Sequence, residues 1–518
     1  MIRTVLAAFT LSLAAPLAAQ PAMERVPDRP AGEGEGPFET LVIRGATMID
    51  GTGAPPEGPV DIVVSGNRIT QIVRGREAQV EADRVIDAKG MFVLPGFVDT
   101  HGHNGDPYKA PQPSYGFKLW LAHGVTSVRG VGFGGGPNDP SLDQKRRSAA
   151  NTITAPRLFA YTVPGDVWPN GRVDSPEKSR EWVRWIAERG YDGIKFFNNE
   201  DPDIMAAILD ESDKVGLGSV AHLGQRGVAK VNAKKATEMG LDGVTHFYGH
   251  FESLLDKSQI PQYPATYNYL DEQSRFAWVA RLAQQVGEPG SEEWDAYIDH
   301  LIDNDVTLSP TFNIYSASRD VMKARNFEWH DRYTLPSLQK FYRPSLINHG
   351  SYYHDWTSED EVAWRDFYRK WFDLTREFKD RGGRITAGSD PGYIYQTWGF
   401  AYVGELEMLR EAGLTPLEVI QAATINGARE IYDAKGEEPP MGSIALGKLA
   451  DLVIVPENPL ANLKVLYGTG HTRLNRETNQ LETVGGVRWT VKDGIVFDAP
   501  KLLEDVAAMV EAQKAREE

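Results

Sequence analysis

Cysteine is absent from the 518 residues of this chain. Its absence excludes disulfide bonds, catalytic thiols and thiolate metal ligands, so any bound metal ion must be held by nitrogen and oxygen atoms. Histidine is also scarce, at 11 residues, which makes the position of each imidazole informative. Beyond the N-terminus, no apolar run approaches the length of about 18 residues that a membrane-spanning helix requires.

Positive charge is in short supply as well. Lys and Arg number 55 against 72 Asp and Glu, giving a net charge of −17. This balance argues against nucleic acid and anionic membrane surfaces as partners. The aromatic residues in the long insertions at 251–305 and 312–380 favour a small-molecule substrate with an apolar or aromatic part. A homo-oligomer is compatible with the sequence. The length fits one large barrel with a smaller unit beside it.

The N-terminus has the pattern of a signal peptide over residues 1–20. Arg3 supplies a short positive region, residues 5–17 are apolar, and Ala19 lies in a zone of small residues suited to cleavage. The alternative, a membrane anchor, requires a longer apolar run. We therefore expect an exported protein, periplasmic or secreted. Residues 21–37 are rich in Pro, Gly and Glu, which predicts a flexible lead-in.

Short β-like runs stand near both ends of the chain. They cover residues 41–44, 61–64, 69–73 and 84–87, and then 442–455, 487–491 and 494–497. Isolated hairpins are marginally stable, so we expect residues 38–90 and 436–498 to join in one small β-sandwich. Residues 499–518 are expected to form a charged helical tail.

Strands and helices alternate between these two β units. The expected strands cover residues 91–103, 124–129, 156–161, 193–197, 218–222, 243–246, 306–310 and 384–390. This alternation predicts an α/β fold, and eight parallel strands predict a closed (β/α)₈ TIM barrel over residues 91–435. Long insertions at 251–305 and 312–380 hold six of the twelve tryptophans. We expect them to act as lids, whose aromatic side chains either line the pocket or form a core within the insertions.

Polar side chains follow several of the buried strands. The first strand ends in His101-Gly102-His103, and residues i and i+2 of a strand point the same way, so the two imidazoles can share one metal ion. Because all strand ends of a parallel barrel face one mouth, other polar residues at strand ends should lie near this pair. These residues are Lys195, His222, His246 and Asp390.

The residue types suit a hydrolytic centre with two divalent ions. Catalytic zinc takes imidazole and carboxylate ligands, and two ions can share a bridging hydroxide. We expect His101 and His103 on one ion, with His222 and His246 on the other. Asp390 would bind metal and act as the general base.

Lys195 lies in an apolar strand, where a buried ammonium is costly. Carbamylated by CO₂, it would offer a bridging carboxylate. The alternative is a structural ion pair.

The chain resembles the amidohydrolase superfamily from about residue 40 to residue 498. The motifs that carry the resemblance are Leu-Pro-Gly-Phe-Val-Asp-Thr-His-Gly-His, Gly-Tyr-Asp-Gly-Ile-Lys, Thr-Ala-Gly-Ser-Asp, Leu-Thr-Pro-Leu-Glu-Val-Ile-Gln-Ala-Ala-Thr-Ile-Asn-Gly-Ala and Gly-Ser-Ile-Ala-Leu-Gly-Lys-Leu-Ala-Asp-Leu-Val-Ile. The resemblance implies a metal-dependent hydrolase with a barrel and a split β-sandwich. Its binuclear branch, with imidazolonepropionase-like and prolidase-like members, implies a carbamylated lysine at Lys195.

One departure concerns the substrate. Prolidase-like relatives usually show Gly-Gly-His after the third strand, where residues 163–170 of this chain contain no histidine. Tyr248 and His250, just past the sixth strand, are candidates for the contact with the substrate carbonyl, and ordinary loop packing is the alternative.

Four other histidines are expected to have structural roles: His123, His300, His330 and His471.

We therefore expect an exported amidohydrolase that cleaves a non-peptide amide or related C–N bond with metal-activated hydroxide. Zinc is chosen on ligand type and availability. The alternatives are an Xaa-amino-acid dipeptidase, a lactone or ester hydrolase, and a binding module on the same scaffold. A mononuclear deaminase would leave Lys195 unexplained.

Overall fold

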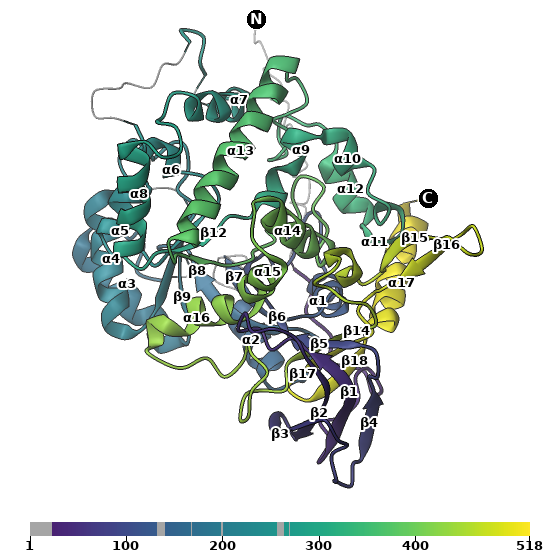
Figure 1. Ribbon diagram of the computed structural model, residues 1–518. Helices are drawn as coiled ribbons and strands as arrows, with labels where there is room; N and C mark the ends of the chain where they lie inside the picture. Colours follow the sequence, from purple (N-terminus) through teal and green to yellow (C-terminus); the bar gives the residue numbers. More distant parts are fainter. Residues whose placement is uncertain are drawn as a thin grey trace, which may run out of the picture.

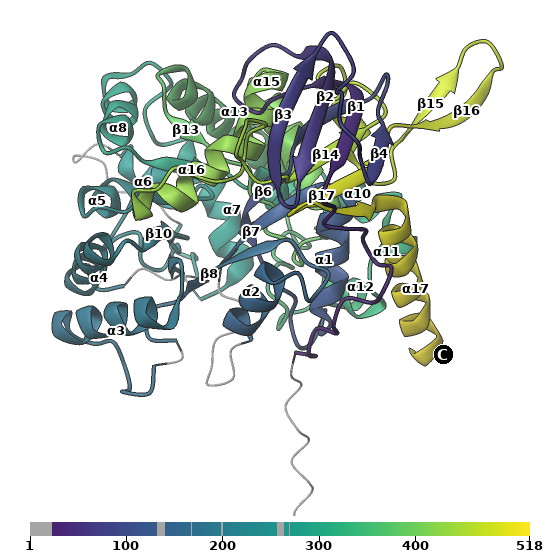
Figure 2. The same cartoon turned by 90° about the horizontal axis from the view of Figure 1, so that it is seen from below.

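A computed structural model describes residues 23–131, 140–166, 168–197, 200–255, 264–268 and 270–517. Its centre is a curved parallel sheet surrounded by helices, and a second sheet stands at one side (Figures 1 and 2). The expected signal peptide, residues 1–20, lies outside the described residues. Among the helices that are described, none combines the length and the apolar character needed to cross a membrane.

The parallel sheet contains eight strands that pair in the order of the sequence, which confirms the predicted alternation. The strands are β6 (Phe97–Gly102), β7 (Val125–Val131), β8 (Arg157–Thr162), β9 (Gly193–Phe196), β10 (Gly218–Ala221), β11 (Gly243–Thr245), β12 (Thr307–Ser309) and β13 (Arg384–Ile385). β6, β9, β10, β11 and β12 are buried throughout, as expected for a parallel sheet covered on both faces.

The predicted closed barrel is observed only in part, because β6 and β13 do not pair as strands. β13 ends after two residues, and the chain beyond it leaves regular strand geometry, with Asp390 at a φ of 44°. Two backbone hydrogen bonds nevertheless join this segment to β6. Thr100 N donates to Ala387 O at 3.0 Å, and Asp390 N donates to His101 O at 2.8 Å. The sheet is therefore an incompletely closed barrel, in which the edge strand β6 and the segment after β13 are joined by isolated hydrogen bonds rather than by a strand ladder.

Residues 91–103, expected as a single strand, form two strands that belong to different sheets. β5 (Phe92–Pro95) pairs with β14 (Leu452–Val455), whereas β6 pairs with β7. Gly96 separates them, and its N–H donates to Asp451 O at 2.7 Å. A side chain at position 96 would collide with Thr126, so only glycine allows this passage from one sheet to the other.

The second sheet unites strands from both ends of the chain, as predicted. Its order is β18-β17-β14-β5-β1-β2-β3, with β4 paired to β1. β1 (Leu41–Met48) pairs with β4 near its start and with β5 near its end, so the strands form one branched sheet rather than two separate ones. The remaining strands are β2 (Glu57–Ser65), β3 (Arg68–Arg74), β4 (Arg84–Asp87), β17 (Trp489–Lys492) and β18 (Ile495–Asp498).

Helices cover the parallel sheet. Those between its strands include α1 (Pro113–Ala122), α2 (Ser141–Ala149), α3 (Pro176–Arg189), α4 (Pro202–Val215) and α5 (Ala233–Glu238), and α14 (Phe400–Glu411) follows the last strand, β13. The helical segment from Pro416 to Tyr432 has an irregular centre, because α15 (Pro416–Gln421) and α16 (Gly427–Tyr432) flank a π-helical turn. This turn meets the end of β13, where Asn426 Nδ2 donates to Ile385 O at 3.0 Å.

The insertions are mainly helical and flank β12. They hold α6 (His250–Ser253), α7 (Glu272–Ala283), α8 (Glu292–Asp303), α9 (Ser316–Arg319), α10 (Val321–Arg325), α11 (His330–Tyr333), α12 (Pro336–Tyr342) and α13 (Ser358–Asp380). Trp294, Trp364 and Trp371 are at most 1% exposed. These three indoles therefore belong to an internal aromatic core, which was one of the two alternatives expected.

Both ends of the described chain are packed against the molecule. Residues 23–37, expected as a flexible lead-in, make specific contacts: Glu24 N donates to Pro111 O at 2.8 Å, and Val26 is buried. The predicted helical tail is observed as α17 (Ala499–Glu517), which lies against α1 with Leu502 and Val506 buried.

Candidate metal centre

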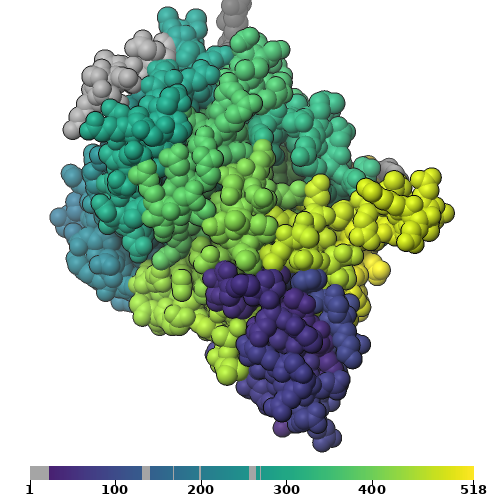
Figure 3. Space-filling view, in the orientation of Figure 1, coloured from purple at the N-terminus to yellow at the C-terminus, as the bar shows by residue number. Residues whose placement is uncertain are grey.

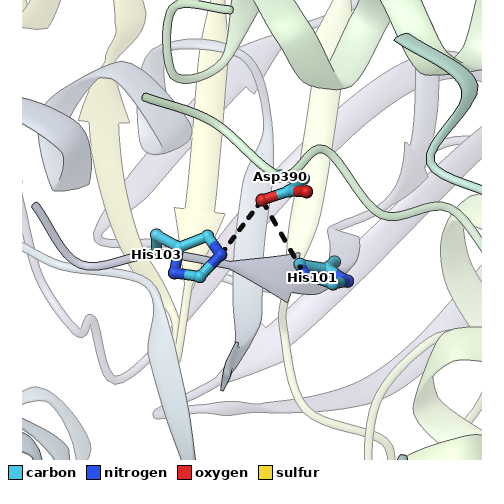
Figure 4. Close-up of side chains that lie close together, drawn as sticks. All are labelled: His101, His103 and Asp390. Carbon is cyan, nitrogen blue, oxygen red and sulfur yellow. Dashed lines mark ion pairs between the residues drawn. The ribbon is translucent and has the colours of Figure 1, made fainter. Parts of the chain in front are cut away.

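Five strands of the parallel sheet deliver the six predicted ligands to one place. His101 lies in β6 and His103 just beyond it, Lys195 lies in β9, and the other three follow the ends of β10, β11 and β13. Asp390 is the common neighbour. Its Oδ1 is 3.0 Å from His103 Nε2 and 3.8 Å from His101 Nε2, and its Oδ2 is 3.6 Å from His246 Nε2. Figure 4 shows the rings of His101 and His103 on either side of the same Asp390 oxygen.

The histidine pair expected on one ion, His101 and His103, lies next to the pair expected on the other, His222 and His246. The rings of His222 and His246 are 4.7 Å apart, and those of His101 and His246 are 4.8 Å apart, measured between centroids. Lys195 enters from β9 and donates from Nζ to Thr245 Oγ1 at 3.1 Å. His101, His246 and Lys195 are nearly fully buried, whereas the side chain of His103 is 22% exposed and marks the open side.

Burial dominates the electrostatics of the cluster. It lowers the pKa of His101, His222 and His246 well below the usual value, and neighbouring cationic groups lower it further. Neutral imidazoles keep the lone pair that a metal ion needs. Burial likewise lowers the pKa of the Lys195 amine well below its usual value, which favours the uncharged form that reacts with CO₂.

The residues fit a divalent metal ion on two counts. The ligand atoms of His101, His103 and Asp390 all lie within 4.8 Å of one another. In addition, His101 Nδ1 and His246 Nε2 are buried without a hydrogen-bond partner, which is unfavourable for a polar atom in a protein interior unless another ligand satisfies it. Nitrogen and oxygen donors of this kind suit zinc and similar ions.

Thr311, which the sequence gave no reason to select, orients His246. The Thr311 hydroxyl donates to Pro310 O at 2.6 Å and is also bonded to His246 Nδ1. Since the hydroxyl has one proton, it must accept the bond from an Nδ1–H, and the His246 Nε2 lone pair is left facing Asp390. Both His246 and Thr311 have positive φ angles, 65° and 52°, so the backbone is strained where the side chains are aligned.

Asp99 is a second residue that sequence reasoning passed over, although it stands two positions before His101. It is fully buried and accepts hydrogen bonds from His101 N at 3.1 Å, Ser389 N at 2.9 Å and Trp120 Nε1 at 2.9 Å. Burial raises its pKa to about 6 despite these donors. Asp99 thereby fixes the backbone beside both His101 and Asp390.

The two weak candidates for substrate contact lie in different surroundings. The ring of Tyr248 is 4.3 Å from that of His222, and its hydroxyl is 2.8 Å from that of Tyr315. His250 is buried, with Nδ1 2.6 Å from the Tyr297 hydroxyl. Tyr248 therefore borders the cluster, whereas His250 has the packing role that was the alternative for it.

The remaining histidines of the sequence prediction have structural partners. His123 Nδ1 lies 2.8 Å from Leu119 O, and His300 Nε2 lies 2.9 Å from Thr237 Oγ1. His330 and His471 also bond to neighbouring groups, through Ala324 O and Asn462 respectively. These contacts agree with the structural roles expected for them.

Comparison with known proteins adds relatives that match part of the chain. Residues 369–496 match the model of the Amidohydrolase family. The chain is 42% identical over 88 residues to the N-acyl-D-glutamate deacylase of Alcaligenes xylosoxydans xylosoxydans, a match covering 17% of each protein. It is 28% identical over 218 residues to the dihydroorotase of Geotalea daltonii, covering 39% of this chain and 48% of the relative. The chain thus spans less than half the length of either relative.

Solved structures match over most of the chain. A Xaa-Pro dipeptidase with bound methionine in its active site has a TM-score of 0.59 at 20% identity, covering 89% of this chain and all of that one. The bottromycin amidohydrolase has a TM-score of 0.60 at 18% identity, covering 92% and 91%. At these identities the likeness concerns the fold. The sequence matches, which cover part of the chain, support its resemblance to the amidohydrolase superfamily.

Proposed function

We propose that this protein is an exported binuclear metal-dependent amidohydrolase that cleaves an amide or related C–N bond. The observation that carries the proposal is the convergence of four imidazoles, Lys195 and Asp390 from five strand ends. Two buried imidazole nitrogens there, His101 Nδ1 and His246 Nε2, have no hydrogen-bond partner among the described residues. The eight-stranded sheet would act as the (β/α)₈ barrel of the superfamily, with the site at the carboxyl ends of its strands.

The ligand types divide between two ions. His101 and His103 would hold one, and His222 and His246 the other. Asp390 and the carbamate of Lys195 would complete the set. The ligand types favour zinc as the divalent ion. Once bound, the ions would supply Lewis acidity for the scissile carbonyl and lower the pKa of a water molecule.

The protein's own residues move the proton. The Asp390 carboxylate, whose oxygens face three imidazoles, accepts the proton of the attacking water and returns it to the leaving nitrogen. Thr311 keeps the His246 Nε2 lone pair free, and Asp99 holds the backbone of His101. Tyr248, stacked beside His222, is the proposed contact for the acyl part of the substrate.

The substrate class that we favour is the N-acylamino acids. The two deacylases among the sequence relatives, for N-acyl-D-glutamate and N-acyl-D-aspartate, support this choice. Xaa-amino-acid dipeptides and lactones or esters are the alternatives. Export rests on the signal-peptide pattern of residues 1–20, and N-terminal sequencing of the protein recovered from the periplasm or the medium tests it.

The test is a hydrolysis screen of the zinc-loaded mature protein with N-acylamino acids of both configurations, dipeptides, aryl amides and lactones. The proposal predicts turnover of at least one amide, lost on chelation and restored by metal. Lys195→Ala should lose activity and regain part of it with added acetate or formate, small carboxylates that can replace the carbamate. Metal-independent turnover, or binding of the panel without turnover, would count against it.

A further inference from the structure

Lys109 has a buried amine, whose pKa is lowered to about 7 because burial outweighs the raising effect of the Asp106 and Asp390 carboxylates. The residue is 3% exposed, and its Nζ lies 3.1 Å from the centre of the Tyr393 ring and 4.2 Å from that of Phe341. Within the described part of the chain, Nζ forms no salt bridge with a carboxylate. Attraction to an aromatic face is weaker than the penalty for removing an ammonium group from water. The charged form of the Lys109 side chain thus lacks a counter-ion that would offset the cost of its burial.

The chain fixes Lys109 in this position. Lys109 lies on a tight turn in which Asp106 N donates to Ala110 O at 3.0 Å and Ala110 N donates to Asp106 O at 2.9 Å. Ser337 Oγ donates to Lys109 O at 2.7 Å and ties the turn to α12. The neighbouring carboxylate, Asp106, already accepts from the Tyr108 N–H at 2.8 Å within the same turn. The lysine is therefore held by its backbone rather than by an ion pair.

Tyr393 connects Lys109 to the metal centre. Its ring stands edge-on to that of His103, with centroids 5.8 Å apart, and it also contacts the Lys109 amine and the rings of Phe341 and His349. Tyr393 follows Asp390 by three residues, and Lys109 follows His103 on the loop after β6. A single aromatic ring therefore separates the Lys109 amine from the metal ligand that is most exposed.

We propose that Lys109 binds the α-carboxylate of the substrate, which makes the favoured substrate an N-acylamino acid with a free carboxyl group. The α-carboxylate of such a molecule is three bonds from the carbonyl carbon under attack, so its binding cation must lie close to the metal ligands, as Lys109 does. The inference deepens the proposed function and rests on it. It names the residue that distinguishes acids from neutral amides.

The experiment compares acids with their uncharged counterparts. N-acetyl amino acids with aromatic, aliphatic and acidic side chains, in both configurations, are paired with the corresponding carboxamides. Wild-type protein, Lys109→Met and Lys109→Arg are tested. Methionine keeps an unbranched chain over the Tyr393 and Phe341 rings without the charge. Lys340→Met, which removes an exposed positive charge from the same helix as Phe341, is the matched control.

In steady-state kinetics we expect Lys109→Met to raise KM for the preferred acid by about 10- to 100-fold, the effect of losing a charge-assisted hydrogen bond. KM for the matching carboxamide should change less than threefold, Lys109→Arg should recover part of the loss, and Lys340→Met should match the wild type. An equal change for acid and carboxamide would mean a structural role and would overturn the inference.

Equilibrium binding separates this inference from the proposed function. Calorimetric titration of the same pairs does not require turnover. Tighter binding of acids than carboxamides, abolished in Lys109→Met, supports a carboxylate site even if no amide is cleaved. If no acid binds more tightly than its carboxamide, the inference fails even where hydrolysis is observed. Thermal unfolding of each variant shows whether the fold is retained.

Discussion

At the scale of single residues, the hydroxyl of Thr311 orients His246, one of the proposed metal ligands. It donates to Pro310 O and so obliges His246 to carry its proton on Nδ1. Partners of this kind raise the affinity of a metal site by fixing the ring and its tautomer. Thr311 thereby links a strained turn after β12 to the ligand that follows β11.

Thr311→Val should therefore weaken metal binding by about 10- to 100-fold, while the protein remains folded. Competition with a chromogenic chelator measures the affinity. Thr375→Val is the control, because Thr375 is an equally buried threonine whose hydroxyl bonds to Trp371 O in α13, away from the site. Equal affinities in the two variants would remove Thr311 from the account.

Glu405 predicts a pH dependence of stability. It is fully buried in α14, where it accepts from Asn313 N at 2.9 Å, and burial raises its pKa to about 8. A carboxyl group with a raised pKa stabilises the fold at pH values below its unfolded pKa, and this contribution is lost as the pH rises through the folded pKa. Stability should thus fall between about pH 5 and pH 8.

Glu405→Gln keeps an acceptor for Asn313 N without the titration. Relative to the wild type, this variant should become progressively more stable as the pH is raised from 5 to 8, as measured by urea unfolding at each pH. A difference between the two proteins that stays constant over this range would contradict the assigned ionisation.

The convergence of the candidate ligands could be predicted because each is a polar residue at or near the end of an apolar strand. His101, His222 and Asp390 are of this kind. Thr311 and Lys109 could not be predicted, because they lie in loops whose path no periodicity reveals. The position of Asp99, two residues before a candidate ligand in an apolar strand, could have marked it as a residue of the site. Its hydrogen-bond partners could not be predicted, because Ser389 and Trp120 are far away in sequence.

At the scale of elements, Gly96 is the point where the chain passes from one sheet to the other. β5 before it and β6 after it read as one apolar run, and nothing in that pattern indicates that they pair in different sheets. The backbone at Gly96 approaches the Thr126 side chain so closely that no Cβ fits. A backbone contact, which hydrophobic periodicity does not encode, therefore decides the boundary.

Gly96→Ala should destabilise the protein by about 1–3 kcal/mol, the range for forcing an added methyl group into a packed interior. Gly404→Ala is the matched control. Gly404 lies in α14, and a Cβ there would meet only the Tyr467 hydroxyl, at 4.0 Å. That substitution should be neutral or stabilising, because alanine favours helix. Chemical unfolding measures both, and equal effects would refute the steric explanation.

At the scale of the molecule, Arg157 joins the parallel sheet to the branched sheet. It stands at the start of β8 and forms ion pairs with Asp451 and Asp493, which flank β14 and β17. Arg157→Met should destabilise the protein by about 3–5 kcal/mol, because the buried Asp451 carboxylate loses its cationic partner and Asp493 keeps only Lys492. Arg146→Met, on exposed α2, should have little effect. Urea unfolding measures both, and a small loss for Arg157→Met would mean that the sheets hold together without this network.

The overall architecture was largely predictable from alternation of strands and helices and from β-like runs at both ends. What could not be predicted depends on distant contacts. The barrel edges meet through Thr100, Ala387 and Asp390 rather than through a strand ladder, and residues 23–37 are packed although their composition suggests flexibility. Amino-acid composition and the periodicity of apolar residues indicate the local preference for helix, strand or loop, whereas these contacts arise from tertiary packing.

The central claim is that four histidines, Lys195 and Asp390 form one binuclear centre, and metal content per chain tests it most directly. Gently purified protein, analysed by mass spectrometry of the elements, should contain about two divalent metal ions per chain, and Lys195→Ala should contain clearly fewer. Fewer than one ion in the wild type, or full metal content and activity in Lys195→Ala, would contradict the account.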